Sequence, residues 1–102
     1  MKIEEIRALC SDETIEVTSH MLQRLQKRNI AYSEVKQALW NGVIIEDYPE
    51  DYPYPSCLVL GITTNSRIIH IVVGIGGDKL WLITAYEPDS DKWSEDFKVR
   101  KE

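Results

Sequence analysis

The sequence predicts an α+β protein in which N-terminal helices pack on a four-stranded antiparallel sheet and a C-terminal helix follows. Two observations lead to this prediction. Apolar residues recur at helical spacing up to about residue 41, and from residue 43 they occur in four short runs rich in β-branched and aromatic residues. The links between these runs are short, which favours strands that pair in sequence order and run antiparallel.

Three helices are expected before residue 42. The first covers "KIEEIRALC" (2–10), and the polar stretch "SDETIEV" (11–17) reads as a turn. The second helix starts at Thr18 or Ser19 and the third at Ser33, because a short hydroxyl side chain accepts a hydrogen bond from a free N–H of the first turn. The dipeptide Asn41–Gly42 ends the third helix, since glycine tolerates the left-handed conformation at the C-terminal cap.

Four strands are expected over 43–48, 57–62, 67–73 and 79–86, and "GIGGD" (74–78) forms the hairpin turn between the last two. A hairpin centred near 76–77 places His70 opposite residues 83–85. Strict alternation gives the last strand one shared face, formed by Leu80, Leu82, Thr84 and Tyr86.

The end of the chain predicts a helix. Trp93 and Phe97 are four residues apart in "KWSEDFKVRK" (92–101), which places them on one side of a helical turn. We therefore expect a C-terminal helix with an aromatic face, which would complete the α+β arrangement.

Composition limits the class of protein. The 102 residues suit one domain over 1–102, and 17 acidic against 12 basic residues give a net charge of −5, which argues against a uniformly basic nucleic-acid-binding surface. The two cysteines form no C-x-x-C pair and read as small buried residues in a reducing compartment. No apolar run approaches the roughly 20 residues of a membrane span, and the N-terminus carries acids where a signal peptide needs bases. We expect a cytoplasmic protein without membrane attachment.

Positive charge is concentrated in one segment. Residues 18–37 hold four Lys or Arg and one acid, so their net charge is +3 and the remainder carries −8. On a helix, His20, Arg24 and Lys27 lie within about 60° of one another, and Arg28 borders the apolar side. Arginine binds phosphate through two parallel hydrogen bonds, and histidine exchanges a proton near neutral pH. This edge is either an anion site or an ordinary solvated helix face.

Two further features admit more than one interpretation. His70 lies among β-branched residues, which suits a core histidine with satisfied hydrogen bonds as well as a catalytic one. The loop "EDYPEDYPYP" (46–55) holds four acids and three tyrosines, but its spacing fits no calcium loop. We expect no metal there. The loop reads as a proline-stiffened solvent loop or as a surface for a protein partner.

Several segments together resemble a widespread family of small prokaryotic domains of unknown function, which is grouped with the RelE-like and BrnT-like toxins of the barnase–EndoU–colicin–RelE fold. The resemblance runs from about residue 18 to residue 101, through "HMLQRLQKRNI", "NGVIIEDYPEDYPYPSCLVLG", "IHIVV" and "ITAYEPDSDKW". It implies helices against an antiparallel sheet, and a metal-independent ribonuclease or the toxin of a toxin–antitoxin pair. A pI near 5 departs from the basic character of nuclease toxins.

The resemblance, together with the basic helix edge, yields a candidate site. Metal-independent RNA cleavage needs a base, an acid and fixed positive charge around the phosphate. The candidate catalytic residues are His20, Arg24, His70 and Tyr86. The candidate substrate-binding residues are Lys27, Arg28, Thr84 and Lys92. We expect no cofactor, RNA or the ribosome and a cognate antitoxin as partners, and a monomer or weak dimer.

Two other functions remain open on the sequence. The first is a catalytically silent module of the same fold, which holds a protein partner through the tyrosine-rich loop. The second is a small-anion-binding domain, in which the basic helix edge grips a carboxylate or phosphate. The nuclease hypothesis predicts that His20 and Arg24 share a cleft with Thr84, Tyr86 or Lys92.

Overall fold

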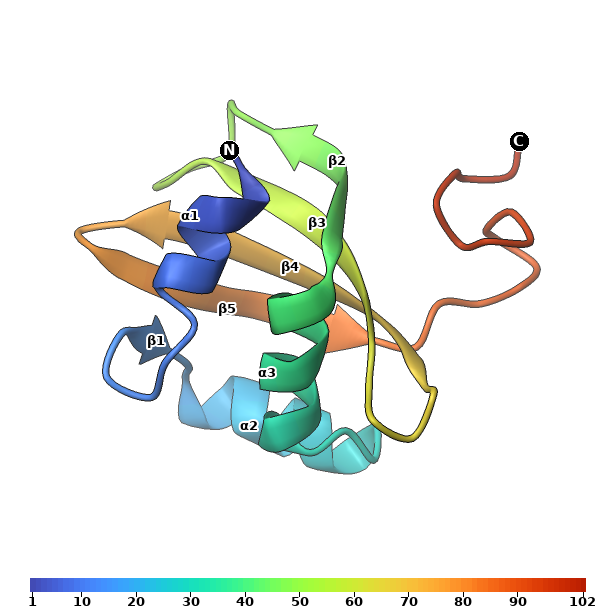
Figure 1. The fold of residues 1–102 in the computed structure, drawn as a ribbon, viewed down its shortest axis with the longest axis horizontal. Helices are drawn as coiled ribbons and strands as arrows, with labels where there is room; N and C mark the ends of the chain where they lie inside the picture. The colour runs from blue at the N-terminus through green and yellow to red at the C-terminus, as the bar shows by residue number, and fades with distance from the viewer.

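A computed structural model describes all residues, 1–102, and confirms an α+β fold (Figure 1). The elements, in chain order, are α1 (Ile3–Ala8), β1 (Ile15–Glu16), α2 (Ser19–Lys27), α3 (Tyr32–Asn41), β2 (Val43–Tyr48), β3 (Ser56–Ile62), β4 (Ile68–Gly76) and β5 (Lys79–Tyr86). The strands form one sheet in the order β1-β5-β4-β3-β2. Helices α1 and α3 cover one face of this sheet, which we call the helix face, and α2 lies beside β5. We call the opposite side the outer face.

The sheet has five strands and is mixed, so the prediction of four antiparallel strands was wrong in this detail. The additional strand, β1, runs parallel to β5 and pairs Ile15 with Leu80 and Glu16 with Trp81. It was missed because two residues are too few to show an alternating pattern, and because its flanking residues read as a polar turn. The four predicted strands do form the antiparallel part of the sheet.

Local chemistry explains where the helices begin. The Thr18 hydroxyl accepts a hydrogen bond from the Met21 N–H at 3.1 Å, which confirms Thr18 as the cap of α2. The predicted cap of α3 was wrong. Ala31 takes that position in place of Ser33, and the Glu34 carboxylate accepts the Ala31 N–H at 3.0 Å.

Glycines at α3 serve close packing. Gly42 follows α3 as predicted, but its φ of −77° is not left-handed. A Cβ at Gly42 would lie 2.6 Å from the Ala38 carbonyl oxygen, and one at Gly61 on β3 would overlap the Ala38 backbone. The two glycines therefore let α3 lie directly on the sheet. The core between the two layers includes Ile6, Leu25, Val35, Leu39, Val59, Ile69, Ile71, Val73, Leu80 and Leu82.

A β-bulge divides β5 into two halves with opposite alternation. Val73 pairs with Leu82 but Val72 pairs with Thr84, so Ile83 is an extra residue in the ladder. Leu80, Leu82 and Ala85 belong to the core, whereas Thr84 and Tyr86 share the outer face with their partners on β4. The predicted common face of Leu80, Leu82, Thr84 and Tyr86 was therefore wrong. His70 pairs with Tyr86 instead of residues 83–85.

The predicted C-terminal helix does not form. Residues 88–102, which we call the C-terminal segment, leave β5 as an irregular chain (Figure 1). The Asp89 carboxylate accepts the Asp91 N–H at 2.8 Å, and Phe97 adopts a left-handed φ of 61°, so local turns replace the helix. Trp93 and Arg100 form an isolated antiparallel bridge. The chain thus doubles back and buries Trp93, which is only 4% exposed.

Candidate functional site

The exposed face of α2 presents an imidazole and a guanidinium that contact each other. Arg24 donates its Nε–H to Nε2 of His20 at 3.1 Å, one helical turn away, and both side chains are exposed. Nε2 of His20 is therefore the acceptor in this contact. The two terminal nitrogens of Arg24 have no hydrogen-bond partner within the protein, and neither has the Lys27 ammonium. This face therefore places an imidazole beside two cations that keep unpaired donor groups.

Arg28 occupies a different place, at the junction of α2 and β5. One of its terminal nitrogens donates to the Thr84 hydroxyl at 3.1 Å and to the Ala85 carbonyl at 2.8 Å. β1 pairs only with the first half of β5, so the Ala85 carbonyl lies on the open edge of the sheet. Arg28 supplies the missing donor there. It lies about 12 Å along the helix axis from His20.

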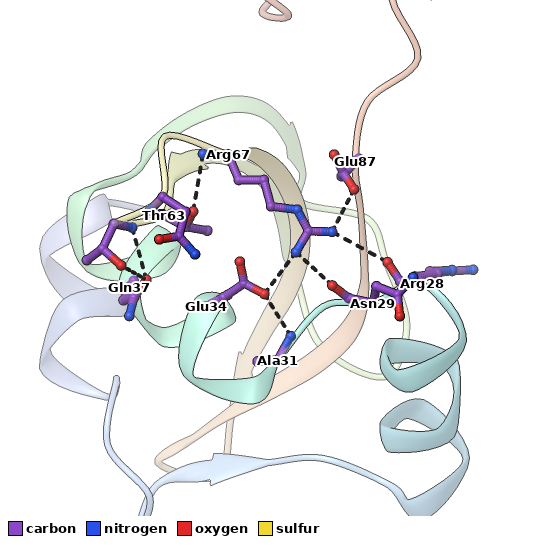
Figure 2. A network of polar contacts seen from close by, with 10 residues as sticks. Arg28, Asn29, Ala31, Glu34, Gln37, Thr63, Arg67 and Glu87 are labelled. Atoms are coloured by element: carbon purple, nitrogen blue, oxygen red, sulfur yellow. Dashed lines mark hydrogen bonds and ion pairs between the residues drawn. The ribbon is translucent and has the colours of Figure 1, made fainter.

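A third arginine, Arg67, fixes the connection between α2 and α3 (Figure 2). Its guanidinium donates to the Asn29 carbonyl at 2.7 Å, to Glu34 at 2.9 Å and to Glu87 at 2.6 Å. The hydrogen bond from Ala31, followed by that from Arg67, holds the pKa of the Glu34 carboxyl below its ordinary value. Figure 2 shows the Arg28 side chain directed away from this network. The network therefore anchors the end of α2 and leaves the Arg28 side chain free to bind β5.

His70 and Tyr86 form a covered pair on the outer face. His70 is fully buried, and its Nε2 lies 2.8 Å from the Phe97 carbonyl, which can only accept, so Nε2 carries the proton. The Tyr86 hydroxyl then donates to Nδ1 at 3.3 Å. The Trp93 ring packs edge-on against His70, with 4.4 Å between ring centroids. Burial lowers the pKa of His70 and raises that of Tyr86, so both side chains are neutral and satisfied.

An ion pair holds the C-terminal segment over this pair. Arg100 binds both carboxylate oxygens of Glu46, at 2.9 and 3.0 Å, and lies over the Trp93 ring, 4.7 Å from its centroid. The Tyr48 hydroxyl also donates to Glu46. Burial and the neighbouring carboxylate raise the pKa of Tyr48 to about 12. The segment is thus attached to β2 by charge and to β4 by aromatic packing.

The predicted site residues therefore lie in four places. His20, Arg24 and Lys27 lie on the exposed face of α2, Arg28 and Thr84 bind each other at the edge of β5, His70 and Tyr86 are covered, and Lys92 is exposed on the C-terminal segment.

Two arginines that organise these places, Arg67 and Arg100, were not predicted as site residues. Arg67 lies one residue before β4 and read as the first residue of the strand predicted at 67–73, and Arg100 fell within the segment 92–101 that was predicted to be helical. The only sequence feature near Arg67 is the polar run "TTNSR" (63–67) between two apolar strands. This run indicates a turn, but it does not show which residues Arg67 contacts.

No three His, Cys, Asp or Glu side chains lie close enough together to hold a metal ion. No helix has the length and apolar character to cross a membrane.

Comparison with known proteins identifies one family. A family model described as "Domain of unknown function (DUF4258)" matches residues 17–87, from just before α2 to just after β5. No curated protein and no solved structure matches the chain. The matched region includes the exposed face of α2, the Arg28–Thr84 junction and the His70–Tyr86 pair, and it stops before the C-terminal segment. The match spans well over half of the chain, which therefore belongs to the DUF4258 family of unknown function.

Proposed function

We propose that this chain is a metal-independent endoribonuclease of the toxin type, related to RelE-like and BrnT-like toxins, and that the exposed face of α2 binds the RNA phosphate. The observation that carries the proposal is the contact between Arg24 and His20. It places an imidazole beside a guanidinium whose two terminal nitrogens are free. Arginine with this freedom binds a phosphate through parallel hydrogen bonds.

The reaction proceeds by attack of the 2′-oxygen on the adjacent phosphorus. Arg24 turns from His20 to the phosphate, and the released Nε2 takes the 2′-hydroxyl proton. The new bond from the 2′-oxygen to phosphorus forms, and the bond from phosphorus to the 5′-oxygen breaks. Arg24 and Lys27 stabilise the negative charge that grows on the phosphate oxygens. The leaving 5′-oxygen takes its proton from water, because His70 is buried under Trp93 and the Tyr86 hydroxyl is bonded to His70. With only one exposed proton-transfer group, we expect slow cleavage.

The second candidate is a phosphate-binding module that does not cleave. The observation that favours it is the burial of His70, whose two ring nitrogens are bonded to Tyr86 and Phe97 within the fold. Both candidates use the same face of α2 and differ only in the role of His20. In either, RNA on the ribosome and a cognate antitoxin are the proposed partners.

The test separates binding from cleavage. Binding is followed by fluorescence anisotropy of a labelled single-stranded 12-nucleotide RNA with 2′-O-methyl groups, which cannot be cleaved. Cleavage is followed by gel electrophoresis of the unmodified RNA, free and on ribosomes. The variants are Arg24→Ala, His20→Ala and, as control, Gln23→Ala, which changes an exposed neutral side chain of the same helix. Each lost phosphate contact should reduce the slope of log K against log salt by about 0.7.

The nuclease proposal expects Arg24→Ala to weaken binding and His20→Ala to abolish cleavage while binding is retained. The Gln23→Ala control should match the unmodified chain in both assays. Binding without cleavage on either substrate supports the phosphate-binding module. Absence of binding at low salt overturns both candidates.

A further inference from the structure

A groove of about 340 Å³ opens on the outer face, at the end of β5 opposite to Arg28. The residues that line it come from the β2–β3 loop, β4 and β5, and are Asp51, Tyr52, Pro53, Tyr54, Gly74, Trp81, Leu82 and Ile83. Gly74 forms part of its floor, because a Cβ there would lie 3.6 Å from Cδ1 of Ile83 and 3.2 Å from the Pro55 carbonyl oxygen. The missing side chain leaves the hollow.

Two aromatic rings make a fixed wall. Tyr54 and Trp81 stack with 5.8 Å between centroids and 25° between planes. Trp81 donates its indole N–H to the Gly76 carbonyl at 3.0 Å, and the Tyr54 ring packs on Gly76 so closely that a Cβ would overlap it. Ile83 is 49% exposed beside this wall. The groove therefore offers ring faces and an aliphatic side chain that the fold holds in place.

The charge around the groove is negative. Asp51 is the only charged residue that lines it. The Ser56 hydroxyl donates to one carboxylate oxygen of Asp51, and the other oxygen has no partner. Of the other acids in the loop, Glu46 is paired with Arg100 and Asp47 with the amino terminus, but Glu50 is unpaired. A polyanion is repelled here, whereas a cation meets both a carboxylate and electron-rich ring faces.

We propose that this groove binds the side chain of an arginine or lysine from a basic segment of a protein partner. The methylene stem packs on Ile83 and Tyr52, and the cationic end lies against the Trp81–Tyr54 wall and the free oxygen of Asp51. Tyr52 is 95% exposed, which leaves an aromatic ring available to close over the stem. The volume suits one long side chain and is at the lower end for a small-molecule pocket. The proposal is independent of the nuclease function, because the groove and the exposed face of α2 share no residue.

The test uses a defined probe, the peptide acetyl-Gly-Leu-Arg-Leu-Gly-amide, and a matched peptide with Glu in place of Arg. Binding is followed by NMR through the indole N–H signals of the full chain. Trp81 reports on the groove, and Trp40, which is 60% exposed on α3, serves as an internal control. We expect the Arg peptide to move the Trp81 signal with saturation in the millimolar range, and to leave Trp40 unchanged.

Two variants test the chemistry without disturbing the core. Asp51→Asn keeps an acceptor for the Ser56 hydroxyl but removes the negative charge. It should lower the affinity for the Arg peptide about three- to tenfold. Tyr52→Ala removes an exposed ring and should lower the affinity for the Arg peptide about threefold. No Trp81 shift with the Arg peptide, or equal binding of the Glu peptide, overturns the proposal. A Trp81 shift caused by a single-stranded RNA instead would assign the groove to a nucleobase and also overturn it.

Discussion

Replacement of Arg67 by alanine should lower the free energy of unfolding by about 2 kcal/mol. Most of this loss comes from the half-buried ion pair with Glu34 and from the bond to the Asn29 carbonyl. Hydrogen bonds to a charged group contribute about 1.5–3 kcal/mol to stability. The pair with Glu87, which is 55% exposed, adds at most about 1 kcal/mol. Glu34 keeps its bond to the Ala31 N–H in the variant, which limits the loss.

Thermal unfolding followed by circular dichroism at neutral pH measures the effect. For a chain of this size, 1 kcal/mol corresponds to about 4–8 °C, so the midpoint should fall by about 8–16 °C. Arg67→Lys should recover only part of the loss, because one ammonium cannot reproduce the fork that reaches Asn29, Glu34 and Glu87. Lys27→Ala is the control, since it removes an exposed cation without a partner. A fall of less than about 4 °C for Arg67→Ala would refute the assigned role.

Three further predictions follow from the packing. Gly61→Ala places a Cβ into the Ala38 backbone and should lower the free energy of unfolding, measured in urea, by about 1–3 kcal/mol. An unchanged urea midpoint would contradict this and would show that α3 moves away from β3 at no cost. Burial holds the pKa of His70 below 6.5, so the folded state binds fewer protons than the unfolded state, and stability should fall as pH drops below 6.5. His70→Gln should flatten this part of the curve of unfolding free energy against pH, and an equal slope in both proteins would contradict the assignment. Diethyl pyrocarbonate, which modifies accessible neutral imidazoles, should label His20 and not His70, whereas Trp93→Ala should make both reactive by mass spectrometry.

Much of the fold was predictable because the signals are local. The strands at 43–48 and 79–86 have the predicted bounds, since runs of β-branched and aromatic residues end there at turn residues. The bulge at Ile83 could not be predicted from the sequence. The position of an extra residue in a strand pair is set by the pairing with the neighbouring strand, which the pattern of β5 alone does not contain. The C-terminal helix failed for a different reason. Trp93 and Phe97 have helical spacing, but side-chain bonds such as that of Asp89 stabilise turns instead.

The candidate site was predictable only where it lies within one element. The grouping of His20 and Arg24 follows from helical periodicity and is present in the structure. The contact of Arg28 with Thr84 joins residues 56 positions apart, and no periodicity reports it. The burial of His70 could not be predicted either, because it depends on the C-terminal segment, which was expected to be helical.

The bond from Arg28 to the Ala85 carbonyl also bears on how this protein meets other chains. An unpaired strand edge is a template for strand addition and aggregation. Here a side chain already occupies the open half of β5, and at the other edge a bulge between Ile44 and Glu46 interrupts β2. The remaining edge, β1, is two residues long. Strand addition at β5 must first displace Arg28, so this part of the sheet edge is blocked against edge-to-edge pairing.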